Sequence, residues 1–483
     1  MPTLIGRDQE HQTFQAALDS DQPELIAVYG RRRVGKTFLI REFFAQHTCF
    51  ELVGIHHADL PTQLRAFSRV LSAATKAPSE LRPPADWYEA FAQLTAFLKT
   101  KLRRGTSKHV VVFDEVPWLA GRRSEFLPAF EHFWNSWASQ HPRLIVVLCG
   151  SAASWMLQNI VTQRGGRHHR VTRRVRVEPF NLADAEAMLQ SRRVELGRYQ
   201  TIELYLALGG IPHYLAQVEP GLSAAQNIDR LCFAKNGLLK DEFHHLFESL
   251  FEQSERHEAV VRALATKCSG LSRTELLRLA RLDTGGAASK VLEELHESGF
   301  ISQLPQLGKT HRDGVFWLAD EFSLFHLTWL SKGGGSRWLE RQGTPAWRAW
   351  IGLAFEMLCL KHVFAIKHAL GISGVETVTA SWAERPGRLL EDGAQIDLVI
   401  DRADRCTNLC EMKFSEGPFT IDKAYAKVLR HKRDAFRDVT KTRKALFVTL
   451  VTSYGLTNNQ YSQELVAKAL TMDSLFYKPP LER

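Results

Sequence analysis

The feature that most constrains this chain is a glycine-rich loop between an apolar run and an amphipathic helical pattern. LIAVY (25–29) predicts a buried strand, and GRRRVGKT (30–37) follows it directly. The loop fits the spacing G-x-x-x-x-G-K-[ST] through Gly30, Gly35, Lys36 and Thr37. In such loops backbone N–H groups surround phosphates, the lysine contacts the β- and γ-phosphates, and the hydroxyl binds Mg²⁺. The sequence therefore predicts a binding site for ATP and Mg²⁺.

Polar residues follow two further apolar runs. Asp114 and Glu115 come directly after HVVVF (109–113), where a parallel strand would reach the ligand crevice at its carboxyl end. We expect Asp114 to hold Mg²⁺ through water and Glu115 to act as a general base on the attacking water. The alternative is a solvated pair that caps the next helix. Ser151 follows LIVVLC (144–149) in the same way, and we expect it to orient water or the γ-phosphate.

The order of apolar patterns predicts an α/β fold with several parts. Strand-like runs alternate with helical patterns over 1–200, which predicts the parallel sheet of a P-loop ATPase core. A helical lid is expected at 201–254. Short helices followed by two strand-like runs predict a winged helix-turn-helix at 255–335. After SKGGGSR (331–337), a flexible break, we expect a separate α/β domain at 345–483.

Charge and cysteine content limit the class of protein. The net charge of +9 and the pI near 9.2 favour a polyanionic partner such as nucleic acid, although ordinary solubility charge explains them equally well. The seven cysteines are scattered and odd in number, which is typical of a reduced compartment. Cys406 and Cys410 lack the further ligands of a zinc site. No signal peptide or apolar span is recognisable, so we expect a cytoplasmic protein without membrane contact.

Together these residues resemble the archaeal-type ATPase family, a branch of the AAA+ and STAND-like P-loop proteins. The resemblance covers the first 330 residues and depends on the order of its motifs, which are Ile5-Gly6-Arg7 with Glu10, the P-loop, Asp114-Glu115, Cys149-Gly150-Ser151, Glu178-Pro179-Phe180 and Gly209-Gly210-Ile211-Pro212. It implies ATP hydrolysis and a homo-oligomer.

The resemblance also implies an arginine finger that acts on a neighbouring subunit's γ-phosphate. Arg170 is the candidate, and Arg167 can substitute for it. The family usually has Tyr-Gly-Arg at this point, whereas this chain has His168-His169-Arg170. The basic run around Arg170 is equally consistent with a nucleic-acid phosphate patch or a solvated surface.

A second group of polar residues lies in the last third of the chain. QIDLVIDR and NLCEMKF predict two strands, with Asp397 on the first and Glu411 and Lys413 on the second. Glu411 and Lys413 are two residues apart and so share a face, and a hairpin would bring Asp397 beside them. Neighbouring carboxylates repel unless a divalent cation neutralises them, which predicts a Mg²⁺ site, with Mn²⁺ as an alternative. Lys413 would orient or deprotonate water, or steady the phosphate.

This D…E-x-K pattern resembles the core of the PD-(D/E)XK nuclease superfamily, a restriction-endonuclease-like α/β fold. The resemblance implies a further ligand on the preceding helix, Glu356, so that Glu356, Asp397 and Glu411 would hold the metal. Two alternatives stay open. The carboxylates are ordinary strand-end residues with Lys413 paired on the surface, or the fold is a degenerate nuclease kept as a binding module.

Two basic sets are candidates for phosphate contacts. In the winged-helix segment they are Arg273, Arg278, Arg281 and Lys290, and in the C-terminal domain they are Lys423, Lys427, Arg430, Lys432 and Arg433. Relay of motion between domains explains the first set as well, and a solvated helix face explains the second.

The sequence thus predicts an ATPase coupled to a metal-dependent nuclease acting on nucleic acid, with DNA as the expected form, in defence or DNA processing. The main alternative is a STAND-like regulatory ATPase whose inert C-terminal fold binds a partner. A protein remodeller is less favoured, since no pore-loop aromatic signature is recognisable.

Overall fold

The computed structural model describes residues 4–103, 105–121, 124–161, 171–251, 253–267, 270–308, 314–331, 337–384, 386–387 and 392–478 of the 483-residue chain. It divides into two compact units, Met1–Glu178 with Leu481–Arg483, and Pro179–Pro480. The four-part division expected from the sequence stays a prediction, and its first part, 1–200, extends past the border between Glu178 and Pro179.

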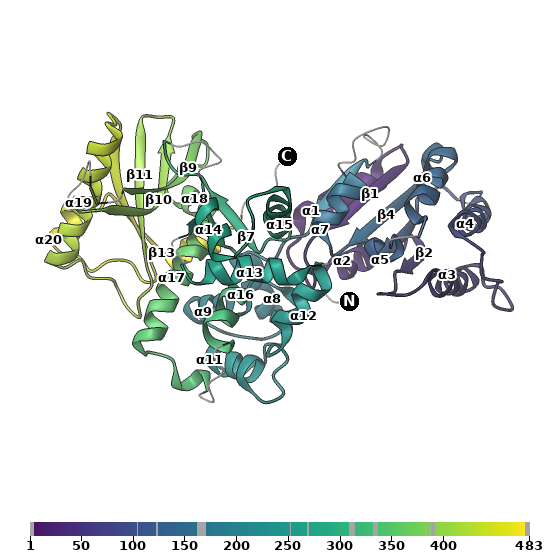
Figure 1. Cartoon of the computed structure of the whole chain (residues 1–483), viewed down its shortest axis with the longest axis horizontal. Helices are drawn as coiled ribbons and strands as arrows, with labels where there is room; N and C mark the ends of the chain where they lie inside the picture. Colours follow the sequence, from purple (N-terminus) through teal and green to yellow (C-terminus); the bar gives the residue numbers. More distant parts are fainter. Residues whose placement is uncertain are drawn as a thin grey trace. The chain divides into compact units, whose positions relative to one another are not determined.

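Unit 1 is built on a parallel sheet of five strands in the order β2-β3-β4-β1-β5. Strands β1, β2 and β4 of this sheet are labelled in Figure 1. The strands are β1 (Glu24–Tyr29), β2 (Thr48–Val53), β3 (His109–Asp114), β4 (Leu144–Gly150) and β5 (Arg173–Arg176). Every residue of β1 and β4 is buried, which explains why these strands read as unbroken apolar runs rather than as alternating patterns. The predicted α/β core with a parallel sheet is confirmed.

The helices of unit 1 are α1 (Asp8–Asp19), α2 (Lys36–Phe43), α3 (Leu60–Thr75), α4 (Trp87–Leu102), α5 (Val116–Leu119), α6 (Phe126–Ser136) and α7 (Ala153–Met156). Helices α3 and α4 begin at Asp59 and Asp86, whose carboxylates accept N–H groups of the first turn. Together with α6 they form an aromatic core in which Phe91 packs on Phe113 of β3, with ring centroids 5.7 Å apart. This core holds the strand ends that carry the polar motifs.

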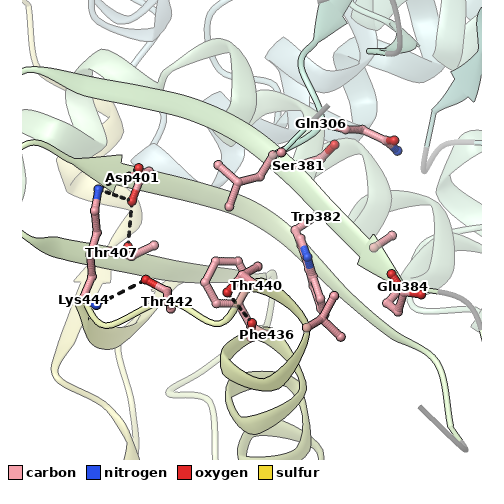
Figure 2. Close-up of a pocket in the computed structure, with 14 residues that line it drawn as sticks. Gln306, Ser381, Trp382, Glu384, Asp401, Thr407, Phe436, Thr440, Thr442 and Lys444 are labelled. Carbon is pink, nitrogen blue, oxygen red and sulfur yellow. Dashed lines mark hydrogen bonds and ion pairs between the residues drawn. The ribbon is translucent and has the colours of Figure 1, made fainter. Parts of the chain in front are cut away.

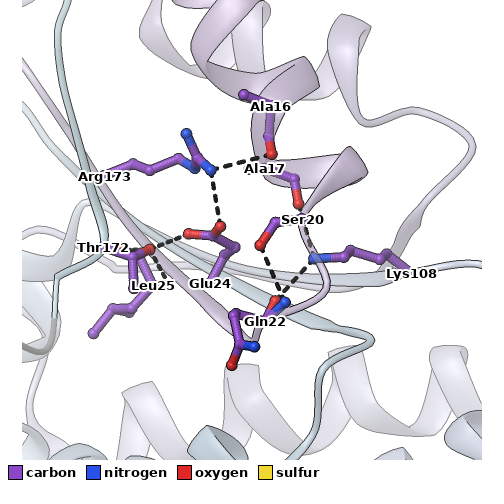
Figure 3. Close-up of polar contacts among 9 residues, drawn as sticks. All are labelled: Ala16, Ala17, Ser20, Gln22, Glu24, Leu25, Lys108, Thr172 and Arg173. Carbon is purple, nitrogen blue, oxygen red and sulfur yellow. Dashed lines mark hydrogen bonds and ion pairs between the residues drawn. The ribbon is translucent and has the colours of Figure 1, made fainter.

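A polar cluster ties the end of α1 to strands β1 and β5 (Figure 3). The Lys108 ammonium donates to the carbonyls of Ala17 and Gln22, each at 2.9 Å. The Arg173 guanidinium donates to the Ala16 carbonyl at 3.1 Å and to the Glu24 carboxylate at 3.0 Å. Cations at the carbonyl end of a helix are favourable because they meet its negative pole.

Unit 2 begins with helices and a small antiparallel sheet. The helices are α8 (Leu182–Ser191), α9 (Arg198–Leu208), α10 (Pro212–Leu215), α11 (Ala224–Ile228), α12 (Glu242–Leu250), α13 (Ser254–Ala265), α14 (Arg273–Leu279), α15 (Gly286–Glu297) and α16 (Glu321–Phe325). The sheet has the order β6-β8-β7, with β6 (Leu271–Ser272), β7 (Ile301–Leu304) and β8 (Val315–Leu318). The helices and hairpin that led us to expect a winged helix are therefore present as elements.

A mixed five-stranded sheet completes unit 2, in the order β13-β12-β11-β10-β9 (Figure 1). Its strands are β9 (Thr377–Glu384), β10 (Ala394–Arg402), β11 (Cys406–Lys413), β12 (Ala445–Thr452) and β13 (Lys468–Thr471). The accompanying helices are α17 (Pro345–Lys361), α18 (Val363–Ala369), α19 (Lys423–Thr440) and α20 (Gln460–Leu465). Strands β9, β10 and β11 are antiparallel neighbours, whereas β11, β12 and β13 run parallel, with α19 as the crossover from β11 to β12.

The helical part of unit 2 packs directly against this sheet. The contacts join residues that precede the glycine-rich segment at 331–337 in the sequence to residues that follow it. Tyr199 of α9 stacks on Phe414, which follows β11, with centroids 4.7 Å apart, and on Tyr454, which follows β12, at 5.7 Å. Lys361 of α17 forms a buried ion pair with Glu321 of α16, at 2.8 Å. These contacts join the segments before and after 331–337 into one unit.

Within the described ranges no single helix is long and apolar enough to cross a membrane. The pair α17 and α18, bent by 75° at their junction, has the length and composition of a membrane span only when the two helices are taken together. Many side chains of α17, among them Trp350 and Phe355, are buried inside unit 2.

Candidate functional site

The P-loop lysine lies in a buried setting of neutral oxygen atoms. Lys36 begins α2, and its ammonium donates to the carbonyls of Gly30 and Arg31 at 3.0 and 2.9 Å and to the Ser151 hydroxyl at 3.1 Å. Only 5% of Lys36 is exposed, and burial lowers its pKa. Neutral oxygen atoms bond the ammonium directly, and the nearby Glu115 and Asp114 carboxylates favour its charged form.

The two motif glycines are needed for different reasons. Gly30 has φ of 148°, and a Cβ there would lie 2.2 Å from the carbonyl oxygen of Val177, the residue that follows β5. The backbone at Val177 therefore leaves no room for a side chain at position 30. Gly35 has φ of 93° and open space around the missing Cβ. Its left-handed conformation precedes the first turn of α2, where free N–H groups can meet a phosphate.

The two carboxylates at the end of β3 accept hydrogen bonds from different hydroxyl groups. The Thr37 hydroxyl donates to Asp114 at 2.6 Å, which brings together the two side chains expected to bind Mg²⁺. The Ser151 hydroxyl donates to Glu115 at 2.6 Å, and the Ser151 amide lies 3.3 Å from the same carboxylate. Glu115 adopts the left-handed region with φ of 50°, a conformation that a non-glycine residue keeps only where its surroundings fix it.

Arg7 is a further part of this site that the sequence suggested only through the family pattern. Its guanidinium donates to the Val34 carbonyl at the tip of the P-loop, 2.8 Å, and to the Glu178 carbonyl, 2.7 Å, and it pairs with Glu10 at 3.2 Å. Only 9% of Arg7 is exposed. It therefore fixes the loop relative to the last residue of unit 1.

The two arginine-finger candidates, Arg170 and Arg167, lie outside the described residues, so their roles stay predictions. The described arginines that follow in the same run bond within unit 1. Arg173 pairs with Glu24, Arg174 donates to the Val161 carbonyl at 3.3 Å, and Arg176 pairs with Glu178 at 3.2 Å. These contacts favour a structural role for the end of the basic run.

The second candidate site lies on the mixed sheet of unit 2. Leu398 of β10 pairs with Cys410 of β11, so Asp397 and Glu411 are the next residues along the two antiparallel strands. The β9–β10 register shifts between Ile396 and Val399, the stretch that contains Asp397. Bulges redirect side chains and are common beside functional sites.

The carboxylates of this site influence one another. Burial, and next the Asp397 carboxylate, raises the pKa of Glu356 on α17 to about 8. The same two causes raise the pKa of Glu411, which is 3% exposed. The Asp397 Oδ2 atom is buried without a hydrogen-bond partner. Glu356, Asp397, Glu411 and Lys413, which the sequence assigned to one site, therefore lie close enough to interact.

A lysine takes part in this cluster in a way that sequence reasoning missed. Lys432 of α19 contacts both Glu411 oxygens at 2.7 Å, and Tyr425 of the same helix donates to Glu411 at 3.4 Å. Within the described ranges, no group of three or more His, Cys, Asp or Glu side chains is arranged to hold a metal ion. Because Lys432 covers Glu411, the predicted three-carboxylate metal set stays a prediction.

The basic residues considered for phosphate contacts are partly engaged inside the chain. On α19, Arg430 pairs with Glu464, Lys432 with Glu411, and Arg433 with Asp434. In the segment 255–335, where we expected a winged helix, Arg273 donates to the Ser289 hydroxyl at 2.9 Å, and Lys290 lies 3.7 Å from Glu294. The ion pair at Glu411 draws Lys432 away from the nucleic-acid track proposed for this helix.

Comparison with known proteins bears on the first part of the chain. The sequence profile of a family described as an ATPase domain predominantly from archaea matches residues 4–218. An uncharacterized protein of Methanocaldococcus jannaschii is 22% identical over 330 residues, which cover 68% of this chain and 69% of that protein.

Solved structures give a weaker likeness. A Walker-type ATPase of Pyrococcus abyssi is 18% identical with a TM-score of 0.47, covering 67% of this chain and 96% of its own. The ORC2 protein of Aeropyrum pernix is 14% identical with a TM-score of 0.45, covering 75% and 96%.

The profile match and the P-loop geometry agree with each other. Residues 4–218 contain the P-loop, the Asp114-Glu115 pair and Ser151 on adjacent strands of one parallel sheet, and also the Gly209-Gly210 turn of unit 2. Residues 4–218 of this chain are an ATP-binding ATPase domain of the type found predominantly in archaea.

Proposed function

We propose that this protein uses ATP binding and hydrolysis in unit 1 to control metal-dependent cleavage of a nucleic-acid phosphodiester in unit 2. The observation that carries the second half is the carboxylate cluster on the mixed sheet. A half-buried glutamate, a buried glutamate and a buried, unpartnered aspartate oxygen lie beside two lysines. Such an excess of buried carboxylate has a physical explanation if a cation joins it in the working protein.

At the ATP site the side chains divide the work. Lys36 would leave its carbonyl partners for the β- and γ-phosphates. Thr37 and Asp114, already 2.6 Å apart, offer the hard oxygen donors that Mg²⁺ requires. Glu115 would then take a proton from the attacking water once Ser151 releases it towards the γ-phosphate. Arg170, or Arg167, supplied by a second copy of the chain, would stabilise the transition-state charge.

At the second site Glu356, Asp397 and Glu411 are the residues that would hold Mg²⁺ or Mn²⁺, which supplies positive charge at the phosphate oxygens. Carboxylate oxygens are the donors that a hard cation prefers. Burial, and next the Asp397 carboxylate, raises the pKa of Glu356 and Glu411, and the Asp397 Oδ2 atom is buried without a hydrogen-bond partner. Lys413, whose ammonium lies 5.6 Å from the Tyr425 ring centroid, would donate to the phosphate or orient water. Lys432 would have to release Glu411 when the cation binds.

Coupling is supported by contacts made by the first residues of unit 2. The Phe180 amide donates to the Gly210 carbonyl at 2.6 Å, and the Tyr205 hydroxyl donates to the Phe180 carbonyl at 2.7 Å. The Leu182 amide donates to His362, at the α17–α18 corner, at 3.2 Å. Helix α17 also carries Glu356, so the segment that leaves the ATPase unit bonds to the element that carries a candidate ligand.

The test is a cleavage panel with the full-length protein on single- and double-stranded DNA and RNA, with Mg²⁺ or Mn²⁺, and with or without ATP. Asp397→Asn and Glu411→Gln should abolish cleavage and leave ATP hydrolysis intact. Asp401→Asn is the matched control, because Asp401 lies on the same strand but pairs with Lys444. Cleavage that survives in both site variants would refute the nuclease assignment.

One observation favours a second function. Lys432 already neutralises Glu411, as expected if the fold has lost its metal and serves as a binding module of a STAND-like regulatory ATPase. In that case no metal would support cleavage, and nucleic acid or a protein partner would alter ATP turnover without being cut.

A further inference from the structure

A cavity of about 510 Å³ lies in unit 2, and the proposed function does not use it. Figure 2 shows it between strand β9, the carboxyl end of α19 and the segment that follows β7. The volume falls in the range of roughly 300–1,000 Å³ typical of small-molecule sites. None of Glu356, Asp397, Glu411 or Lys413 lines it.

The inner wall of the cavity is aromatic and apolar. Trp382 of β9 and Phe436 of α19 meet edge to face, with centroids 5.2 Å apart, and Val439 and Leu307 pack beside them. Trp382 is 5% exposed and Phe436 1%, so the core fixes both rings and only the small part of their surface that faces the cavity is open to a ligand. A flat ring can enter beside them.

Among the described residues that line the cavity, the charged side chains are Glu384, Asp401 and Lys444. At one side the Lys444 ammonium contacts both Asp401 oxygens at 2.8 Å and Thr407 donates to Asp401 at 2.9 Å, so this pair is neutral (Figure 2). At the other side Glu384 adds a carboxylate. Helix α19 ends at Thr440, which is one of the lining residues. The rim therefore disfavours phosphates and favours neutral or cationic groups.

Two segments of unit 2 are hydrogen-bonded to each other beside the cavity. The Ser381 amide of β9 donates to the Pro305 carbonyl at 3.0 Å, and the Leu307 amide donates to the Ser381 carbonyl at 3.1 Å. A molecule held between Leu307 and Trp382 would contact both partners of this pairing. Its binding should therefore slow the opening of these two backbone hydrogen bonds.

We propose that this cavity binds a planar, nitrogen-containing heteroaromatic ring without negative charge, of the size of a nucleoside. The ring packs on Trp382 and Phe436, and its N–H groups donate to the Glu384 carboxylate at the rim. A nucleotide with the same ring is disfavoured, because its phosphate meets Glu384 and the end of α19.

The test uses the full-length chain carrying Lys36→Ala, which removes nucleotide uptake by the P-loop. The probes are adenosine, the cationic 1-methyladenosine, and adenosine monophosphate, measured by equilibrium dialysis. Adenosine should bind saturably at one site per chain, 1-methyladenosine at least as tightly, and the monophosphate at least about tenfold more weakly. Hydrogen exchange of the Leu307 and Ser381 amides should slow when adenosine is bound.

Two variants locate the binding. Val439→Phe fills the cavity and should abolish adenosine binding, whereas Val378→Phe makes the same change at a residue of β9 that is 55% exposed and outside the lining. Glu384→Gln changes only the rim and should weaken 1-methyladenosine more than adenosine, which keeps the test decisive if Val439→Phe misfolds. Absence of saturable binding, equal affinity for the monophosphate, or binding unaffected by Val439→Phe and Glu384→Gln would each overturn the proposal.

Discussion

The two candidate sites handle buried charge in opposite ways. In unit 1, the buried Lys36 ammonium is held by two carbonyls and a hydroxyl, while Asp114 and Glu115 each accept from a hydroxyl. That site has a cation ready for an anionic ligand. In unit 2, Glu356, Asp397 and Glu411 share two lysines, and burial raises the pKa of two of the three carboxyls.

The difference teaches what each site lacks. A buried charge without full compensation is costly, so the sign of the deficit indicates the sign of the missing partner. The charges at the two sites agree with a phosphate ligand in unit 1 and with the cation that we propose for unit 2. The four predictions below test this contrast.

The largest effect is expected at Glu115. Glu115→Gln should leave ATP affinity within about twofold and reduce turnover by roughly 10²–10⁴, because an amide cannot take the proton of the attacking water. ATP binding by calorimetry and phosphate release under saturating Mg-ATP measure the two quantities. Glu51→Gln, a carboxylate that pairs with Arg41, is the control. Wild-type turnover in Glu115→Gln would place the base elsewhere.

The next effect concerns compensation in unit 2. Lys432→Met should lower the free energy of unfolding by about 3 kcal/mol in EDTA, because Glu411 would lose its ammonium partner in a buried position. Urea denaturation measures this, and millimolar Mg²⁺ should restore part of the loss. Lys444→Met removes a more exposed pair with Asp401 and should cost less than about 1 kcal/mol. Equal losses in the two variants, or no response to Mg²⁺, would contradict a cation-seeking site.

A third prediction uses a buried base that has no charged partner. Burial lowers the pKa of His362 to about 4, below its ordinary value near 6.5. Between these values the unfolded chain binds a proton that the folded chain does not, so stability is complete above pH 6.5 and falls as the pH approaches 4. His362→Gln should remove up to about 3 kcal/mol of this acid-dependent loss.

Urea denaturation between pH 7 and pH 4.5 measures that change. Some acid sensitivity should persist, since burial also lowers the pKa of His326 to about 4. The exposed His245→Gln is the control. An unchanged pH profile in His362→Gln would show that this histidine is protonated in the folded chain.

The smallest effect is expected at Arg7. Arg7→Ala should raise the KM for ATP about tenfold with little change in kcat, because the Val34 and Glu178 carbonyls lose the donor that fixes the P-loop. Arg7→Lys should recover little, since an ammonium lacks the planar fork. Arg41→Ala on α2 serves as the control. A fall in kcat at constant KM would instead assign Arg7 to the chemical step.

Sequence patterns predicted unit 1 well because β1, β3 and β4 are built on short, buried apolar runs. The P-loop and the strand-end carboxylates follow from local spacing, so they needed no tertiary information. The hairpin that brings Asp397 towards Glu411 was also predictable from alternation. In contrast, β9 was missed because its burial is irregular, and β13 because a four-residue edge strand carries little pattern.

Long-range pairings are what the sequence could not supply. Lys432 was assigned to a solvated or nucleic-acid-facing helix surface, whereas a contact 21 residues away decides its position. Similarly, the glycine-rich segment at 331–337 indicated a domain border, but α9 and α16 contact residues on its far side. Glycine content indicates how flexible a segment is, but it does not indicate which helices and strands contact each other in the folded chain.

The contacts of Tyr199 and Glu321 determine where the chain can be divided into fragments that fold. A fragment that starts at 345 would leave Tyr199, Glu321 and their partners behind, exposing Phe414 and stranding the Lys361 charge. The compact units instead meet at Glu178–Pro179. A chimera that exchanges the C-terminal sheet between relatives should therefore exchange everything after Glu178 together. Residues of the helical part and of the sheet that contact each other should also differ together between relatives.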